Sequence, residues 1–482
     1  MSFNSTEFVF FFLAAFYGYW LLSRWRAARL GWLLAGSCLF YMSWNAKFIA
    51  LIAFSSVLDW VCGARIAASD SPRARKAWLA LSLAGNLGLL GFFKYFNFFA
   101  ENVAAACSRL GLETLAEFTP WEIVLPAGIS FYTFQTLSYT IDIYRGELRP
   151  ARSFLDFALF VSFFPQLVAG PIVRAADFLP QLDERPRFDD ARVSGGVFLM
   201  LCGLAKKVLL ADTIGLELVD PVFDAPLEHG AVGVLLGVWA ALFQFYLDFS
   251  AYSDIAIGAA ACLGFTLPQN FDRPFLAQSI SEFWRRWHIS LSTWFRDYVF
   301  VPLGGRGGGQ LAFFRKLMLT MFLTGLWHGA GWNYVLWGLM HGVFTFVGVA
   351  WGKQRTKTEL AARPVWERAA RRVWVFQLVA LSMLFFRNGT VAEGNRGIEG
   401  ALEMLQVLAT HWSSAANLSS LGLAALAAAA LIHFTPREWI HVRGAGVWRG
   451  APAFAQACVL VGATGVLAAL SYAKAPFIYF QF

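Results

Sequence analysis

Two of the seven histidines in this sequence stand where an imidazole could do chemistry. His328 lies in GLWHGAGW, residues 325–332, within a charge-free stretch that extends from 317 to 352. If Lys316 marks a membrane boundary, His328 is ~18 Å inside it at ~1.5 Å of helix rise per residue, close to the bilayer midplane. An ionisable group at that depth is costly and is a functional hypothesis by default. A histidine that only joins two helices by a hydrogen bond is the structural alternative.

His288 belongs to the polar and aromatic segment 284–298, WRRWHISLSTWFRDY. On a helix, its aromatic residues and His288 share one face, and its arginines lie opposite. The pattern predicts an amphipathic helix over 284–298 that lies in the membrane interface or re-enters it, with His288 turned inward. An interfacial histidine among tryptophans, without a catalytic role, fits the spacing equally well.

Acidic side chains also occur in a predicted span, YLDFSAYSDIAIG at 246–258. Asp248 and Asp254 do not share a helix face, so they are not an obvious carboxylate pair. Each could orient a histidine or bind a polar substrate group, and capping or pairing with an arginine explains them equally well. We expect the basic pair Lys206 and Lys207 to mark a cytoplasmic or interfacial boundary. His341 has a weaker context and is expected to be structural.

Other catalytic signatures do not occur in the sequence. HExxH, GxSxG, a Walker A loop and CxxC are all absent, and the six cysteines lie far apart. We therefore expect no metal site and no nucleophile triad. The remaining chemistry is general-base catalysis, in which a buried neutral imidazole takes a proton from a hydroxyl.

The composition indicates that a membrane surrounds these residues. Hydrophobic residues make up 58% of the 482 and charged residues 15%, against about 25% charged in soluble domains. Continuous apolar runs predict an all-α polytopic membrane bundle with about eleven to thirteen transmembrane helices, plus re-entrant or interfacial helices; a β-barrel would alternate apolar and polar residues. We expect one membrane domain over 1–482, with a catalytic core at 120–345 and C-terminal helices at 346–482.

Charge sets the expected orientation and partners. The net charge of +8 fits basic cytoplasmic loops beside anionic membrane lipid, and no nucleic-acid-binding signature occurs. The basic loops 64–76 and 352–372 are expected in the cytoplasm. The acidic stretch 212–228 is expected to be an outside loop, and the N-terminus is also expected outside.

A series of motifs resembles the membrane-bound O-acyltransferase (MBOAT) family, most closely its bacterial branch of alginate O-acetyltransferase type. The resemblance covers essentially the whole chain and is strongest from about 120 to 345. The matching segments are GISFYTFQTLSYTIDIYRG (128–146), FFPQLVAGPIVR (163–174), FYLDFSAYSDIAIG (245–258), NFDRPF (270–275), SEFWRRWHISLSTWFRDYVFVPLGG (281–305), LTGLWHGAGWNYVLWGLMHG (323–342) and FIYFQF (477–482).

The resemblance implies acyl transfer to a hydroxyl in a helical bundle around a funnel or tunnel. His328 matches the family's intramembrane histidine in a WHG context, and His288 matches the second histidine of this branch. The candidate supporting residues are Trp327, Asn333, Asp248 and Tyr252. The glycine-rich run 304–309 departs from relatives that carry more Lys and Arg there, which puts a donor-phosphate contact from this loop in doubt.

The resemblance also implies a setting for the reaction. The enzyme would sit in a bacterial inner membrane, hold no bound cofactor, and use acetyl-CoA or another acetyl thioester as donor. Its partners would be membrane lipid, periplasmic polysaccharide-acetylation proteins, a polysaccharide acceptor reached directly or through a relay, and in one version a cytoplasmic acyl carrier. The alternatives are D-alanyl transfer to a cell-wall polymer by the sister branch, and a non-catalytic conduit for polymer export.

Overall fold

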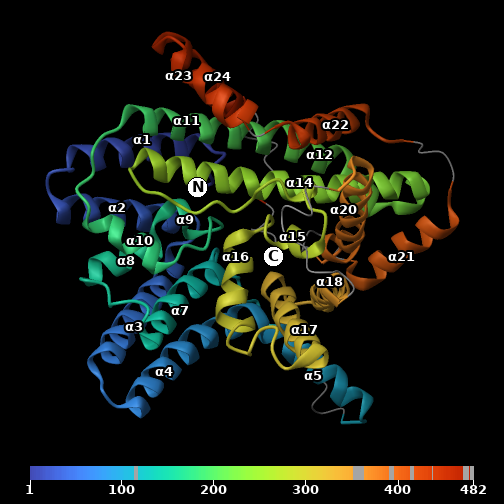
Figure 1. Ribbon diagram of the computed structural model, residues 1–482, viewed down its shortest axis with the longest axis horizontal. Coiled ribbons are helices and arrows are strands. Elements are labelled where there is room, and N and C mark those ends of the chain that lie inside the picture. The colour runs from blue at the N-terminus through green and yellow to red at the C-terminus, as the bar shows by residue number, and fades with distance from the viewer. Residues whose placement is uncertain are drawn as a thin grey trace. The chain divides into compact units, whose positions relative to one another are not determined.

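A computed structural model describes residues 1–112, 118–350, 363–389, 396–412, 417–436, 438–469 and 477 (Figure 1). Every regular element in these ranges is a helix, which confirms the all-α prediction. The contacts group the chain into two compact units. The first consists of Met1, 10–189 and 263–267, and the second of 2–9, 190–262 and 268–482. The single domain expected over 1–482 stays a prediction.

Several helices are long and apolar enough to cross a membrane, so this is a multi-pass membrane protein. Judged by length and composition, six segments of the described chain qualify: Ala46–Ala68, Pro72–Arg109, Asp190–Asp224, Pro226–Cys262, Trp332–Ala350 and Val365–Arg387. A bent pair, α22 (Ser420–Phe434) with Glu438–Gly450, would make seven. Two shorter apolar helices are α1 (Thr6–Leu21) and α24 (Ala453–Ala469).

This count is lower than the eleven to thirteen expected from charge-free runs, because an apolar run need not form one long helix. The run 157–173 forms α8 (Phe154–Ser162) and α9 (Phe164–Leu167), separated at Phe163 and buried within the first unit. The charge-free run 229–247 and the first half of the next run, 255–271, belong to one helix, α14 (Pro226–Cys262), with a kink at Gly230. The length of a charge-free run shows how many apolar residues follow one another, but it does not show where the chain turns within the run.

Most of α1 and the helices α2–α10 form the first unit. Their bounds are α2 (Arg26–Met42), α3 (Ile49–Ala68), α4 (Pro72–Leu90), α5 (Phe96–Arg109), α7 (Ile129–Arg145) and α10 (Ala175–Asp183), besides α8 and α9. Asp59 of α3 accepts hydrogen bonds from Ser82 Oγ at 2.5 Å and Asn86 Nδ2 at 2.8 Å, both on α4. Ser82 also contacts Thr140 of α7 at 3.0 Å. Such buried polar contacts hold helices together where lipid provides no hydrophobic drive.

In the second unit, α11 (Asp190–Ala205) lies alongside α14 (Figure 1). After α11 the chain continues through a π-helical turn η3 (Lys206–Ala211), α12 (Asp212–Ile214), a second π-helical turn η4 (Gly215–Val219) and α13 (Asp220–Asp224). The prediction of an outside loop over 212–228 was therefore wrong in its structure, since most of this stretch is helical. The basic loop 352–372 lies largely outside the described residues.

The segment 284–298 is not one helix, and that prediction was wrong. The chain forms α15 (Ile280–Trp284), a turn that ends at His288, α16 (Ile289–Phe295) and the π-helical turn η6 (Arg296–Phe300). His288 adopts the left-handed conformation, with φ 41° and ψ 56°. The left-handed conformation interrupts the helix, and it costs about 1–2 kcal/mol for a residue other than glycine. The surroundings of His288 must therefore stabilise it.

The described part of the charge-free stretch 317–352 lies in a helical hairpin. It consists of α17 (Gly309–His328) and α18 (Trp332–Ala350), separated by an extended backbone at Gly329. The two helices approach closely because a Cβ on Gly325 would overlap the Tyr334 carbonyl oxygen, and one on Gly338 would overlap the Met321 carbonyl oxygen. His328 is the last residue of α17 and packs against Phe386 of α20 (Val365–Arg387), which in turn contacts α21 (Gly397–Thr410).

Candidate active site

The two predicted catalytic histidines both pack against one indole. Trp327 lies with its ring centroid 5.8 Å from that of His288 and 5.0 Å from that of His328, edge-on to both. Both imidazoles are buried. The predictions that His328 is buried and that His288 turns inward are confirmed, whereas the depth of His328 in the bilayer stays a prediction. Two imidazoles on distant parts of the chain thus meet in one place, as one reaction would require.

Aromatic side chains enclose both histidines. Phe249 of α14 packs against His288 at 4.7 Å between ring centroids, while Phe386 of α20 and Trp337 of α18 each lie 5.1 Å from His328. His288 is outside the six candidate spans, and its burial lowers the pKa of the imidazole well below its ordinary value. A neutral imidazole in apolar surroundings can accept a proton or donate one hydrogen bond.

Asn270 holds the turn that presents His288, and sequence reasoning did not single it out. Its backbone oxygen accepts from Ile289 N at 2.9 Å. Its side-chain Oδ1 accepts from Ser290 N at 3.3 Å and from Ser290 Oγ at 2.9 Å. Its Nδ2 donates to Ser253 Oγ on α14 at 3.3 Å. These bonds fix the two residues after His288, so Asn270 is the group that maintains the left-handed conformation. The available signal was its place at the start of NFDRPF.

His341, which sequence reasoning set aside as structural, lies in the same aromatic cluster. Its ring is 4.8 Å from Trp337, the residue that also contacts His328. Its Nε2 lies 3.0 Å from Ser382 Oγ, and that hydroxyl donates its own proton to the Val379 carbonyl oxygen at 2.6 Å. Nε2 must therefore carry the hydrogen in this pair, which leaves Nδ1 as an acceptor. Ser382 thus fixes both the tautomer and the orientation of His341.

Asn333 supports the cluster from the first turn of α18. Its side-chain Nδ2 donates to the Phe385 carbonyl oxygen at 3.2 Å. Phe385 precedes Phe386, whose ring contacts His328. Asn333 therefore joins the start of α18 to the end of α20 and sets where Phe386 lies. Trp327 contacts both histidines and Asn333 binds the residue before Phe386, and their supporting role in the reaction stays a prediction.

Asp248 and Tyr252 lie on α14, within three residues of Phe249, which contacts His288. Asp248 pairs with Lys207 at 2.5 Å, and Lys207 pairs also with Asp212 at 2.8 Å. Tyr252 packs between Phe3 and Phe477, with centroid distances of 4.6 and 4.9 Å. Both residues are buried, but these contacts lead toward α12 and the chain ends. Their predicted part in the reaction stays untested.

The basic pair at 206–207 does not form an exposed boundary. Lys207 is 1% exposed and makes the two ion pairs just described. Lys206 pairs with Asp254 at 2.6 Å and donates to Ser250 Oγ at 3.1 Å. The expectation that these lysines mark a membrane boundary was wrong for Lys207, because carboxylates on α14 and α12 compensate its charge inside the protein.

Comparisons with known proteins identify the family to which this chain is similar. The model of the membrane-bound O-acyltransferase family matches residues 145–386, which include both histidines. The chain is 41% identical over 389 residues to a probable alginate O-acetylase, AlgI, of Pseudomonas aeruginosa, covering 80% of this chain and 72% of that one. It is 33% identical to a peptidoglycan O-acetyltransferase of Helicobacter pylori, covering 86% and 82%. It is 31% identical to a teichoic acid D-alanyltransferase of Streptococcus thermophilus, covering 54% and 67%.

Proposed function

Because the chain belongs to the membrane-bound O-acyltransferase family and is an O-acyltransferase, we propose that it O-acetylates an exopolysaccharide such as alginate, using an acetyl thioester as donor. The observation that carries this proposal is the buried pair His328 and His288, both packed against Trp327. The likeness to a probable alginate O-acetylase over 80% of the chain supports a polysaccharide as acceptor.

In the proposed mechanism, His328 acts as the general base. Its imidazole takes the proton from the acceptor hydroxyl while that oxygen attacks the thioester carbonyl carbon. The new ester C–O bond forms, the C–S bond breaks, and the imidazolium returns the proton to the departing thiolate. His288 holds or polarises the thioester carbonyl by hydrogen bonding, and the aromatic walls exclude water that would otherwise hydrolyse the donor.

The neighbouring residues would act by holding the two imidazoles in fixed positions relative to each other. Trp327 sets the distance between them. Asn333 places Phe386 against His328, and His341 packs against Trp337, which also contacts His328. A displacement of about 1 Å in such an arrangement can lower the rate about a hundredfold, so these contacts matter even without touching substrate.

We further propose that the reaction takes place in a bacterial inner membrane, with acetyl-CoA or an acyl carrier on the cytoplasmic side. Periplasmic acetylation proteins would receive the acetyl group or complete its transfer to the polymer. D-alanyl transfer is the weaker alternative, because the D-alanyltransferase relative covers 54% of the chain against 80% for the probable alginate O-acetylase. A peptidoglycan sugar is a second candidate acceptor, since the peptidoglycan O-acetyltransferase relative matches 86% of the chain.

The test is acyl transfer by the purified protein in liposomes. Radiolabelled acetyl-CoA is supplied on one side, and labelled acetyl ester is measured on alginate, on peptidoglycan fragments and on co-purified periplasmic proteins. We expect donor turnover with wild type and its loss in His328→Ala. His411→Ala, which changes an exposed histidine, is the matched control and should retain activity. Transfer of D-alanine from a charged carrier protein, with no acetyl transfer, would contradict the proposal.

A further inference from the structure

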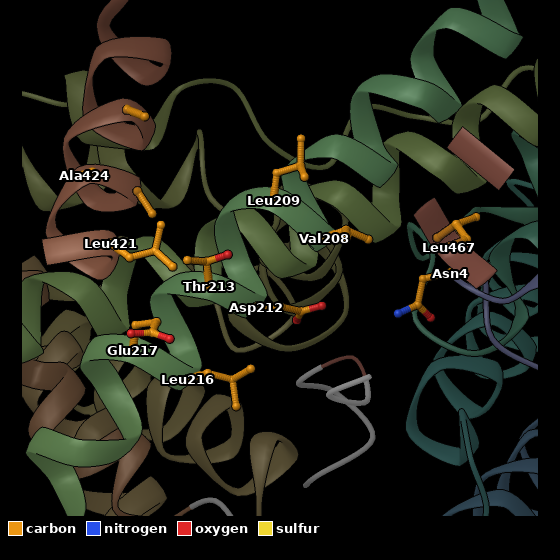
Figure 2. Close-up of a pocket in the computed structure, with 12 residues that line it drawn as sticks. Asn4, Val208, Leu209, Asp212, Thr213, Leu216, Glu217, Leu421, Ala424 and Leu467 are labelled. Carbon is orange, nitrogen blue, oxygen red and sulfur yellow. The ribbon is translucent and has the colours of Figure 1, made fainter. Parts of the chain in front are cut away.

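A separate pocket of ≈ 540 Å³ lies in the second unit, and none of the histidine cluster lines it (Figure 2). Residues of 208–217 form one wall, α22 forms the facing wall, and Asn4 and Leu467 close one end. Its size is within the range of small-molecule sites. The proposed acetyl transfer does not use this pocket.

The rim of the pocket is apolar and exposed. Leu209 is 59% exposed, Leu216 53% and Leu421 60%. In a multi-pass membrane protein, large apolar side chains left exposed on membrane-spanning helices contact lipid tails. Leu209 and Leu216 belong to the candidate span Asp190–Asp224, and Leu421 belongs to α22. The pocket therefore opens toward the hydrocarbon region, and a bilayer lipid has direct access to it.

Two carboxylates line the same pocket, and one of them has a neutral hydroxyl as its described partner. Asp212 lines it and shares the single ammonium of Lys207 with Asp248. Glu217 also lines it, and accepts a hydrogen bond from the neutral Ser419 hydroxyl at 2.5 Å. Carboxylate charge away from water is costly unless a cation pairs with it. The pocket thus combines an apolar entrance with an acidic interior that favours a positively charged group.

The backbone of this wall is distorted where it meets the pocket. Leu209 lies in the π-helical turn η3, and Leu216 and Glu217 lie in η4. Single π-helical turns are rare and frequently mark functional sites, because the added residue changes where neighbouring side chains point. Here the two turns flank α12, which supplies Asp212. The two turns therefore set the directions of Leu209, Leu216 and Glu217 in the wall of the pocket.

We propose that the pocket binds a bilayer phospholipid with a primary ammonium headgroup, of the phosphatidylethanolamine type. Its ammonium would donate to Asp212 and Glu217, and an acyl chain would lie along the leucines of the rim. A choline headgroup carries no N–H to donate to these carboxylates, and a glycerol headgroup leaves the lipid anionic and is repelled by them. The pocket therefore discriminates between lipids that share the same tails.

The experiment compares three lipids with identical acyl chains on the delipidated full-length protein. Native mass spectrometry and thermal unfolding are measured with phosphatidylethanolamine, phosphatidylcholine and phosphatidylglycerol in mixed micelles. We expect phosphatidylethanolamine to bind at least about tenfold more tightly than the other two, which would raise its thermal midpoint selectively. Equal binding of all three lipids would overturn the proposal.

Variants locate the bound lipid. Ala424→Phe fills the pocket from α22 and should abolish the preference, whereas Ala427→Phe changes an exposed residue of the same helix outside the pocket lining and should keep it. Glu217→Gln should bring phosphatidylethanolamine close to the level of phosphatidylcholine. Unchanged selectivity in Ala424→Phe would place the lipid elsewhere and refute the site. Displacement by an equal concentration of free ethanolamine would refute the requirement for a lipid chain.

Discussion

Replacing Asn270 with alanine should disable the site without touching either histidine. Its side chain makes three hydrogen bonds, two with Ser290 and one with Ser253. Each bond stabilises the turn by about 0.5–1.5 kcal/mol, so the three together contribute ~1.5–4.5 kcal/mol. The left-handed conformation of His288 costs about 1–2 kcal/mol. The side chain therefore more than offsets that cost, which explains why the turn persists.

Of the hydrogen bonds that residue 270 makes to the turn, Asn270→Ala keeps only the backbone bond from Ile289 N to the oxygen of residue 270. That bond contributes ~0.5–1.5 kcal/mol. That is close to the cost of the turn, so His288 should leave its position for much of the time. We expect kcat for acetyl transfer to fall about a hundredfold, as for a misplacement of about 1 Å. KM should change much less, because substrate contacts outside the turn remain.

The assay is single-turnover and steady-state transfer of labelled acetyl at matched amounts of inserted protein. Ser253→Ala is the control, since it removes one of the three side-chain bonds and leaves both bonds to Ser290. The kcat of Ser253→Ala should fall by less than about tenfold, which corresponds to the free energy of one hydrogen bond. A kcat of wild-type size in Asn270→Ala, with the protein correctly inserted, would refute the argument that this residue maintains His288.

Three further outcomes are expected. His328→Ala and His288→Ala should each lower acetyl transfer by ~10²–10⁴-fold, and the double variant should be little worse, because residues that act as a unit are non-additive; multiplicative losses would instead indicate two separate steps. Gly325→Ala should lower thermal stability by about 1–3 kcal/mol and lower activity, because its new methyl group meets backbone of the facing helix, while Gly348→Ala, with nothing within 4 Å, should change neither. Equal melting temperatures for the two glycine variants would contradict this account of the hairpin. Ser382→Ala should lower kcat more than it raises KM, because the histidine it orients loses its fixed tautomer; Ser382→Thr, which keeps the hydroxyl, should recover most of the rate, and failure of that recovery would count against the orienting role.

The helical class and the hairpin around His328 could be predicted because local composition decides them. Apolar runs without charge require helices in a membrane. The glycines of GLWHGAGW allow close approach and local unwinding, and the structure has both, at Gly325 and at Gly329. Burial of His328 follows from the same local pattern.

The turn at His288 and the burial of Lys207 could not be predicted because distant residues decide them. The amphipathic pattern over 284–298 continues through the break, and Asn270 captures the backbone after His288 from outside that segment. Lys207 resembles a boundary residue until Asp248, on the next long helix, is placed beside it. The periodicity of apolar residues predicts the faces of a single helix. The turn at His288 and the burial of Lys207 depend instead on contacts between two segments that are distant in the sequence.

The aromatic enclosure of His328 also has a consequence for how the enzyme is made. Phe245 of α14 contacts Phe386 of α20, with ring centroids 5.0 Å apart. The two residues leave the ribosome ~140 positions apart, which at about 5–20 residues per second is a delay of roughly 7–30 s. Until α20 arrives, this face of α14 lacks its partner and must be covered by lipid, by an insertion factor or by an earlier helix. Slow synthesis across this interval should therefore expose the nascent enzyme to misassembly and proteolysis more than slow synthesis elsewhere.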